Sequence, residues 1–266
     1  MDSIIIKNVA NMYRSPSTDC EMVSQTTLGH QVLILQENPG WACIRAWDGY
    51  SGWVKSEWIR RVDPNNPSNR KVMVYSLFAD ALREPCIDAG ILTKLVITSM
   101  MELISDDDPF AHCRLPDGRE TWIERKHLEK VETNADQPNG CRIIRTAERF
   151  LGIPYLWGGT TPFGLDCSGF TQLVYRINGI DLPRDASMQA EDRRGETVEK
   201  DALFPGDLIF FATPGKRISH VGLALGKDTF IHSAGRGEGV RINHLNDEPY
   251  ADLYRNSRRI SQEYPE

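Results

Sequence analysis

Short segments of alternating apolar and polar residues fill the first half of the chain. Residues 32–35 and 41–45 predict two strands, and residues 95–97 and 101–104 predict two more. An Asp-Gly pair stands between apolar runs in the stretch Asp48–Val54, which is a hairpin signal. The pattern therefore predicts small all-β units.

These β segments form an internal repeat. The stretch Asp48–Val54 aligns with Asp117–Ile123, and the same offset pairs Trp41 with Phe110. A repeat of this kind indicates one supersecondary unit used twice. We expect its two tryptophans, Trp53 and Trp122, to be core anchors rather than ligand platforms.

Two polar, turn-rich stretches, residues 63–69 and 133–140, are predicted linkers. They divide the chain into three expected domains, over residues 1–63, 70–132 and 139–262. The first two are the small β barrels of the repeat, and the third has a different pattern.

Helical periodicity appears only in the third segment. Residues 142–151 and 167–177 carry apolar residues at helical spacing, and Asn178-Gly179 ends the second helix. Strand-like runs then follow at residues 207–211, 220–225, 229–232 and 240–242. Helices followed by an antiparallel meander predict an α+β domain.

Composition narrows the possible partners. The formal net charge is −6, which argues against a nucleic-acid-binding surface, and no apolar run reaches the length of a membrane span. The first ten residues lack the apolar core of a signal peptide. If Met1 is the native start, we expect a cytoplasmic protein; a leader removed beforehand would instead mean a secreted one.

Six cysteines are spread singly along the chain, at positions 20, 43, 86, 113, 141 and 167. No Cys-x-x-Cys pair is present, so neither a structural zinc site nor a redox pair is indicated. We expect all but Cys167 to be ordinary reduced cysteines, mostly buried.

Cys167 is the candidate nucleophile because it stands at the expected start of a helix. Unpaired N–H groups and the positive end of the helix dipole would lower the pKa of its thiol and could hold an oxyanion. The alternative is a buried structural cysteine. Asp166, Ser168 and Gly169 make the surroundings polar and close-packed, which argues against that alternative.

His220 and His232 lie on two predicted strands joined by a turn at residues 226–228. A hairpin there would place them opposite one another and on one face. His220 would then take the thiol proton, and His232 would orient it. A Cys-His-His zinc site is the competing use, but no metal-ligand spacing supports it, and we expect no metal or organic cofactor. We expect the remaining histidines to be exposed and unrelated to the chemistry: His30, His112, His127 and His244.

The third segment resembles the NlpC-type cell-wall cysteine peptidases over residues 140–260. The matching motifs, in order, are Tyr155-x-Trp157-Gly158-Gly159, Leu165–Phe170, Leu182-Pro183-Arg184, Ser187-x-Gln189, Pro205–Phe211, His220-Val221-Gly222 and Ile231-His232-Ser233. The resemblance implies a papain-like α+β fold in which Cys167, His220 and His232 are catalytic. It also implies that the Tyr155 hydroxyl lies near the nucleophile, whereas the residues alone favour a core aromatic.

The two repeats resemble bacterial SH3-like domains. Tandem SH3-like domains before such a catalytic domain are similar to the γ-D-glutamyl-L-diamino acid endopeptidases. This architecture implies hydrolysis of the bond between D-glutamate and diaminopimelate or lysine in peptidoglycan stem peptides. It further implies a free N-terminal L-alanine on the peptide, as in murein peptide recycling.

The same resemblance assigns substrate-binding residues. Asp166 and Ser168 would line the pocket, and Arg184 would meet the α-carboxylate of D-glutamate. From the first SH3-like domain, Tyr50 would close the pocket and Glu21 would meet the ammonium group. As alternatives, Tyr50 is an exposed turn residue and Arg184 caps a surface acid.

Three rival functions remain open at this point. A secreted lytic hydrolase would act on intact cross-linked wall, and a wall-binding protein would use the SH3-like domains with a dead catalytic domain. A lipid-directed thiol acyltransferase shares the Cys-His logic but usually has a membrane anchor or strongly apolar segment. The intact Cys-His-His set and the expected free-alanine architecture favour the recycling peptidase.

Overall fold

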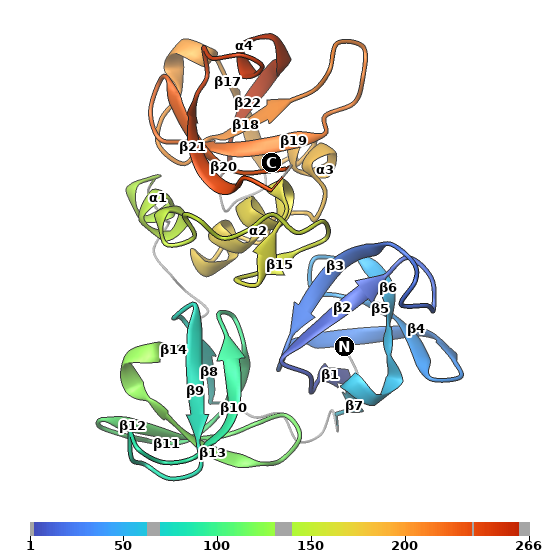
Figure 1. Ribbon diagram of the computed structural model, residues 1–266, viewed down its shortest axis with the longest axis vertical. Coiled ribbons are helices and arrows are strands. Elements are labelled where there is room, and N and C mark those ends of the chain that lie inside the picture. The colour runs from blue at the N-terminus through green and yellow to red at the C-terminus, as the bar shows by residue number, and fades with distance from the viewer. Residues whose placement is uncertain (1–2, 63–69, 131–139, 236, 261–266) are drawn as a thin grey trace. The chain divides into compact units, whose positions relative to one another are not determined.

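The computed structural model describes residues 3–62, 70–130, 140–235 and 237–260. It divides into two compact units, residues 1–133 and 134–266 (Figure 1). Both predicted linkers, residues 63–69 and 133–139, lie outside the described residues, and Gly140 already opens a helix. None of the described helices has the length and apolar content that crossing a membrane requires.

The N-terminal unit begins with a sheet whose strands, over the described residues, run in the order β3-β2-β6-β5-β4-β1-β7. The bounds are β1 Ser3–Ile5, β2 Val9–Tyr13, β3 Met22–Thr27, β4 Gln31–Asn38, β5 Trp41–Arg45, β6 Ser51–Lys55 and β7 Ile59–Arg61, with a short 3₁₀ helix at Ser56–Trp58. The Asp48-Gly49 turn joins β5 to β6 as an antiparallel hairpin.

A second sheet in this unit repeats the first. Its described strands run in the order β10-β9-β13-β12-β11-β8-β14, which is the first order shifted by one repeat. The bounds are β8 Lys71–Val74, β9 Phe78–Leu82, β10 Ile91–Val96, β11 Met100–Asp107, β12 Phe110–Arg114, β13 Glu120–Glu124 and β14 Leu128–Lys130, with a 3₁₀ helix at Arg125–His127. The β12–β13 hairpin carries Asp117-Gly118, so the repeat predicted from the sequence corresponds to equivalent elements.

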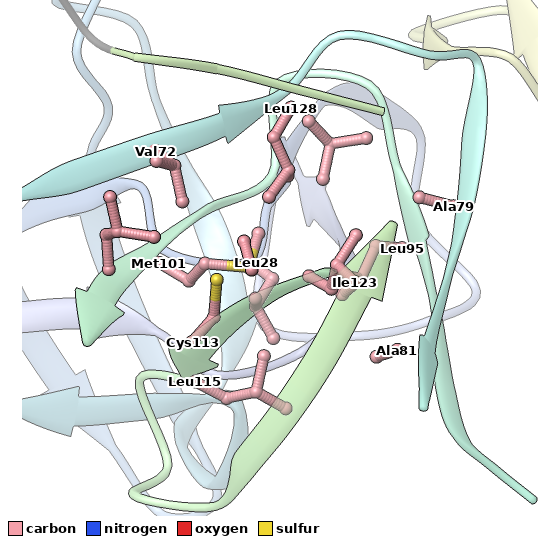
Figure 2. Close-up of a cluster of buried hydrophobic side chains, with 13 residues drawn as sticks. Leu28, Val72, Ala79, Ala81, Leu95, Met101, Cys113, Leu115, Ile123 and Leu128 are labelled. Atoms are coloured by element: carbon pink, nitrogen blue, oxygen red, sulfur yellow. The ribbon is translucent and has the colours of Figure 1, made fainter. Parts of the chain in front are cut away.

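The two sheets share core and polar contacts, which explains why they form one unit. Leu28, from the loop after β3, is fully buried among core residues of the second sheet such as Met101 and Ile123 (Figure 2). The Met100 N–H donates to the Leu28 carbonyl at 2.9 Å. His30 is buried beside Thr98, with its Nε2 3.1 Å from the Thr98 carbonyl oxygen, so the expectation that His30 is exposed is wrong.

Trp53 and Trp122 are not the core anchors that the repeat predicts. Both are half-buried, whereas their neighbours Val54 and Ile123 are fully buried. Because side chains alternate along a strand, the buried neighbours take the core face and the tryptophans take the other. Trp122 instead stacks on His112, with ring centroids 4.5 Å apart.

The C-terminal unit packs helices against an antiparallel sheet, over the described residues in the order β17-β22-β18-β19-β20-β21. Its helices are α1 Gly140–Glu148, α2 Cys167–Ile177, α3 Ala186–Ala190 and α4 Tyr250–Leu253, with a 3₁₀ helix at Lys200–Ala202. Its strands are β15 Thr160–Thr161, β16 Gly164–Leu165, β17 Gly195–Val198, β18 Leu208–Phe211, β19 His220–Ala224, β20 Thr229–Ala234, β21 Gly239–His244 and β22 Tyr254–Ile260. The helices α1 and α2 followed by the meander β18–β21 are as predicted, whereas the strands β15, β16, β17 and β22 and the short helices α3 and α4 were not predicted.

All six cysteines lie in the described part of the chain, and all six are free. The prediction that the five other than Cys167 are mostly buried is wrong. Cys113 is buried, whereas Cys86 and Cys141 are exposed and Cys20 and Cys43 are half-buried.

Candidate active site

Helix α2 presents Cys167 at its first position because Asp166 caps it. The Asp166 backbone is extended, and its Oδ1 accepts from the Gly169 N–H at 2.7 Å. Gly169 itself packs on the preceding loop, where a Cβ would lie 2.2 Å from the Gly159 carbonyl oxygen. Any larger residue would force the helix away from that loop, so the glycine fixes where the cysteine sits.

Asp166, Ser168 and Arg184 form a buried polar cluster beside this helix start. Arg184 is 2% exposed, and its Nη1 donates to Asp166 Oδ1 at 3.0 Å and to Ser168 Oγ at 2.9 Å. The Gly158 N–H also donates to Asp166 Oδ2 at 2.9 Å. Both carboxylate oxygens are therefore bonded, and the two charges neutralise one another.

A buried amide holds the segment that carries Arg184 against α2. Gln189 Nε2 donates to the Ser168 carbonyl at 3.1 Å and to the Pro183 carbonyl at 2.9 Å. Thr171 Oγ1 donates to Gln189 Oε1 at 2.8 Å. The three predicted pocket residues of this unit are thus brought together, and Arg184 caps a buried acid rather than a surface one.

The Cys167 sulfur lies against the backbone on both sides of His220. Its Sγ is 3.9 Å from the Ser219 carbonyl oxygen, and it accepts a hydrogen bond from the Val221 backbone. The sulfur is nearly buried, with Cys167 8% exposed. Strand β19 therefore places His220 beside the start of α2.

The expected lowering of the thiol pKa is wrong for this resting state. Burial, and then the charge of Asp166, raise the pKa of Cys167 to about 12. Hydrogen bonds from the Val221 and Ser168 backbones and the charge of Arg184 act the other way. Desolvation of the sulfur outweighs the helix N-terminus, so the resting cysteine is a thiol.

His220 and His232 form a close pair, although the predicted register is wrong. His220 Nε2 lies 2.7 Å from His232 Nδ1, and the rings are nearly perpendicular at 87°. The β19–β20 pairing of Leu223 with Ile231 places Gly222, not His220, opposite His232. The turn residues 226–228 were predicted correctly. Because the turn is centred on Lys227, the residue opposite His232 is two positions further along β19 than predicted. A shift of two residues leaves the histidine side chains on the same face of the sheet.

Gly222 provides the space for this diagonal contact. A Cβ at position 222 would lie 2.8 Å from Phe230 Cδ2 and 3.0 Å from His232 Cβ. A side chain there would therefore displace one of the two rings.

Both imidazoles are neutral in the resting site. Burial, with repulsion from a charged His232 second, lowers the pKa of His220 to about 3. Burial lowers the pKa of His232 to about 4, and its hydrogen bond with Asn243 opposes that shift. A neutral imidazole beside a thiol can act as a general base, because it is ready to accept the proton.

The structure adds Asn243, which the sequence analysis missed. Its Oδ1 lies 3.0 Å from His232 Nε2. On β21, Arg241 pairs with His232, and Asn243 comes two residues later on the same face. The predicted strand ended at Ile242; extending it by one residue would have revealed a polar side chain beside the histidine pair.

Tyr155 lies within electrostatic reach of this site. It is half-buried and forms a parallel bridge to Leu165, just before the N-cap of α2. Burial comes first, followed by the charge that a Cys167 thiolate would carry and the charge of Asp166; together they raise the pKa of its phenol, so the hydroxyl stays protonated. The residue can therefore donate a hydrogen bond.

Tyr50 and Glu21 belong to the N-terminal unit. Glu21 is exposed, and its carboxylate accepts from Arg14 at 2.6 Å. Tyr50 stands at the end of the turn before β6, where its N–H donates to Asp48 Oδ1 at 3.0 Å. Their assignment to a substrate pocket stays a prediction.

Comparison with known families gives one match in each unit. Residues 152–259 match the NlpC/P60 family, which covers α2 and the sheet with both histidines. Residues 12–59 match the bacterial dipeptidyl-peptidase Sh3 domain, which covers most of the first sheet. The chain thus combines a mostly-β region with an SH3-like domain and an NlpC/P60 domain.

Curated relatives match across both units. A γ-D-glutamyl-L-lysine dipeptidyl-peptidase of Bacillus cereus (strain ATCC 10987 / NRS 248) is 30% identical over 90% of this chain and 75% of its own length. A protein of the same name from Bacillus subtilis (strain 168) is 31% identical over 88% of this chain and 79% of its own.

A solved structure shares the whole fold. The crystal structure of an NlpC/P60 family protein from Bacillus cereus ATCC 10987 superimposes with a TM-score of 0.87 and 25% identity, covering 100% of each chain. The match extends over both units of the chain.

Proposed function

The chain belongs to the NlpC/P60 family of peptidases, and we propose that it hydrolyses the γ-D-glutamyl–L-diamino acid bond of peptidoglycan stem peptides. The observation that carries the proposal is the convergence of a helix-start thiol with two hydrogen-bonded imidazoles, His220 and His232 2.7 Å apart. Relatives that align along most of this chain are named for cleavage after γ-D-glutamate, which supports the bond assigned.

Cys167 is the proposed nucleophile and His220 the base. Because His220 Nε2 faces His232, its Nδ1 is the nitrogen left to take the thiol proton. As that proton moves, the sulfur forms a bond to the γ-carbonyl carbon, and the carbonyl π electrons move onto oxygen. Transfer concerted with attack suits a thiol whose pKa is raised to about 12.

Collapse of the tetrahedral intermediate breaks the C–N bond. The proton on His220 passes to the leaving nitrogen, so the diamino acid departs with a free amine and the acyl group stays on sulfur as a thioester. Water then attacks the thioester while His220 accepts its proton. The C–S bond breaks, the acyl group leaves as the free acid, and the proton on His220 returns to the Cys167 sulfur. The N–H groups at the start of α2 and the Tyr155 hydroxyl are the proposed donors to the oxyanion.

Asp166, Ser168 and Arg184 are the proposed substrate-binding residues. Without substrate, Arg184 donates hydrogen bonds to both Asp166 and Ser168, so the positive charge of Arg184 and the negative charge of Asp166 neutralise each other. A D-glutamate carboxylate would compete with Asp166 for the Arg184 guanidinium. The Asp166 carboxylate, then less neutralised by Arg184, would be able to pair with the free ammonium group of the alanine.

We also assign the second sheet as another SH3-like domain and the C-terminal unit as a papain-like α+β domain. Identical strand order in the two sheets supports the first assignment. A capped helix carrying the cysteine, packed on a sheet carrying the histidines, supports the second.

The test uses three peptides: L-Ala-γ-D-Glu-diaminopimelate, its lysine counterpart, and the N-acetylated form of the first. We expect cleavage after γ-D-glutamate and a strong loss on acetylation, because the pocket would meet an amide instead of an ammonium. Equal cleavage of the free and acetylated peptides would contradict the amine-reading pocket and favour action on intact wall. Failure to cleave any of them would contradict the peptidase proposal itself.

A further inference from the structure

Asn243 ends a chain of hydrogen-bonded groups that leads back to the proposed base. His232 Nε2 lies 3.0 Å from Asn243 Oδ1, and His232 Nδ1 lies 2.7 Å from His220 Nε2. Each neutral imidazole has one N–H and one lone pair, so the proton position at one end of the chain determines the position at the other.

The amide oxygen of Asn243 can only accept. The His232 proton is therefore on Nε2, and the Nδ1 lone pair accepts from the Nε2–H of His220. This leaves the Nδ1 lone pair of His220 unprotonated. The reverse order, with the amide nitrogen of Asn243 donating, would instead place a proton on His220 Nδ1 and remove the base.

We propose that Asn243 is a positioning residue that fixes the tautomers of His232 and His220, so that His220 Nδ1 is the basic nitrogen. The inference rests on the proposed role of His220 and deepens it, since it names the third group behind the thiol. Asn243 touches neither the thiol nor the substrate in this account and acts only through His232.

The surroundings of His232 make this bond decisive. His232 is 1% exposed, with the Phe230 ring centroid 4.7 Å and the Tyr250 ring centroid 5.2 Å away. Water has little access to the ring, so an N–H without Asn243 would lose its acceptor. The titratable and charged groups that act on His232 are His220 on β19, Arg241 on β21, Glu238 in the turn before β21 and Tyr250 on α4.

Two substitutions separate positioning from packing. Asn243→Asp keeps an acceptor at nearly the same volume, whereas Asn243→Leu keeps the branched shape, with a somewhat larger side chain, but cannot form a hydrogen bond. His244→Gln is the matched control, because residue 244 is exposed on the same strand. All are made in the full chain and assayed with L-Ala-γ-D-Glu-diaminopimelate.

We expect Asn243→Leu to lower kcat by about tenfold to a hundredfold with KM nearly unchanged, the size that loss of one buried hydrogen bond gives. Asn243→Asp should rescue most of kcat and move the acid limb of the pH–kcat profile upward, because its charge favours the protonated imidazole. His244→Gln should match the wild type. Unchanged kcat in Asn243→Leu would overturn the proposal.

The tautomers are read directly by ¹⁵N NMR of histidine-labelled chain at neutral pH. Wild type and Asn243→Asp should show protonated Nε2 and unprotonated Nδ1 on both rings, and Asn243→Leu a mixture. A protonated His220 Nδ1 in the wild type would overturn the proposal, even if Asn243→Leu does not fold. This NMR measurement does not depend on catalysis. If the wild type showed the expected tautomers but did not cleave the peptides, the proposed function would be rejected and the role of Asn243 would be retained.

Discussion

Cys113 and Cys167 are both buried, yet their surroundings prepare them for different fates. Cys113 lies on β12 in the apolar core of the second sheet, fully buried (Figure 2). Burial raises the pKa of Cys113 to about 12, as it does for Cys167. Burial and thiol pKa therefore do not distinguish a structural cysteine from a nucleophile.

The neighbours make the difference. Cys113 is packed among side chains such as Leu28, Met101 and Ile123, which offer no proton acceptor. Cys167 stands at a helix start, with its sulfur against the residues on either side of His220. The site of Cys167 therefore provides a neutral base beside the sulfur rather than a resting thiolate.

Replacing each cysteine in turn should give the largest effect. Cys167→Ser should lower kcat/KM by at least about a thousandfold, because the weaker nucleophile replaces the thiol, with little change in stability. Cys113→Ser should leave kcat/KM unchanged and lower the free energy of unfolding by about 1–3 kcal/mol, since the new serine hydroxyl would be buried among apolar side chains. Peptide hydrolysis and urea denaturation measure both. If Cys167→Ser retained its activity, Cys167 would not be the nucleophile and would not differ in role from Cys113.

Crowding the imidazole pair should give the next effect. In Gly222→Ala the new methyl group meets Phe230 and His232, so we expect kcat to fall by about tenfold or more and stability to fall by about 1–3 kcal/mol. Gly226→Ala is the control, because no atom lies within 4 Å of the added Cβ. If Gly222→Ala and Gly226→Ala had the same kcat in the peptide assay, the space that Gly222 leaves opposite His232 would not be needed for catalysis.

The buried neutral imidazoles predict how stability depends on pH. The folded pKa values of about 3 and about 4 lie below the unfolded value of roughly 6.5, so the unfolded chain binds more protons in between. The free energy of unfolding should therefore fall as pH falls from about 6.5 toward 4. His232→Gln should reduce that slope, and the exposed-site variant His244→Gln should keep it. Urea denaturation at several pH values measures the slopes, and an unaltered slope in His232→Gln would argue against a neutral buried pair.

The smallest effects are expected in the N-terminal unit. Glu21→Gln and Tyr50→Phe should raise KM for the free-amine peptide by about threefold each, the size of a modest polar contact, with kcat unchanged. The acetylated peptide should not respond to Glu21→Gln. Steady-state kinetics with both peptides measures this, and identical responses to the two would reject an ammonium contact at Glu21.

Much of the local structure follows from the sequence. Helix α2 begins at Cys167 and ends at Ile177 as predicted, because Asp166 caps its start and Asn178-Gly179 ends it. The hairpin of β19 and β20 was placed correctly, and the shared face of its histidines follows from even spacing. The repeat likewise predicted equivalent hairpins in the two sheets.

Other features depend on tertiary context that periodicity does not encode. Strand β22, Tyr254–Ile260, buries Ser257 and Ile260 but is otherwise polar, so it has no strong apolar pattern. The thiol pKa depends on how deeply packing buries the sulfur. His30 was expected at the surface, yet contact between the two sheets buries it.

The central claim is that Cys167 attacks the γ-glutamyl carbonyl and carries the acyl group. The most direct measurement is to quench the reaction with acid during the first turnover and map the thioester by mass spectrometry. The account predicts an L-Ala-γ-D-Glu acyl group on the peptide that contains Cys167, formed in step with release of the diamino acid. Two results would contradict this claim. One is a burst of diamino acid, equimolar with the enzyme, while Cys167 carries no acyl group; the other is an acyl group on a different cysteine.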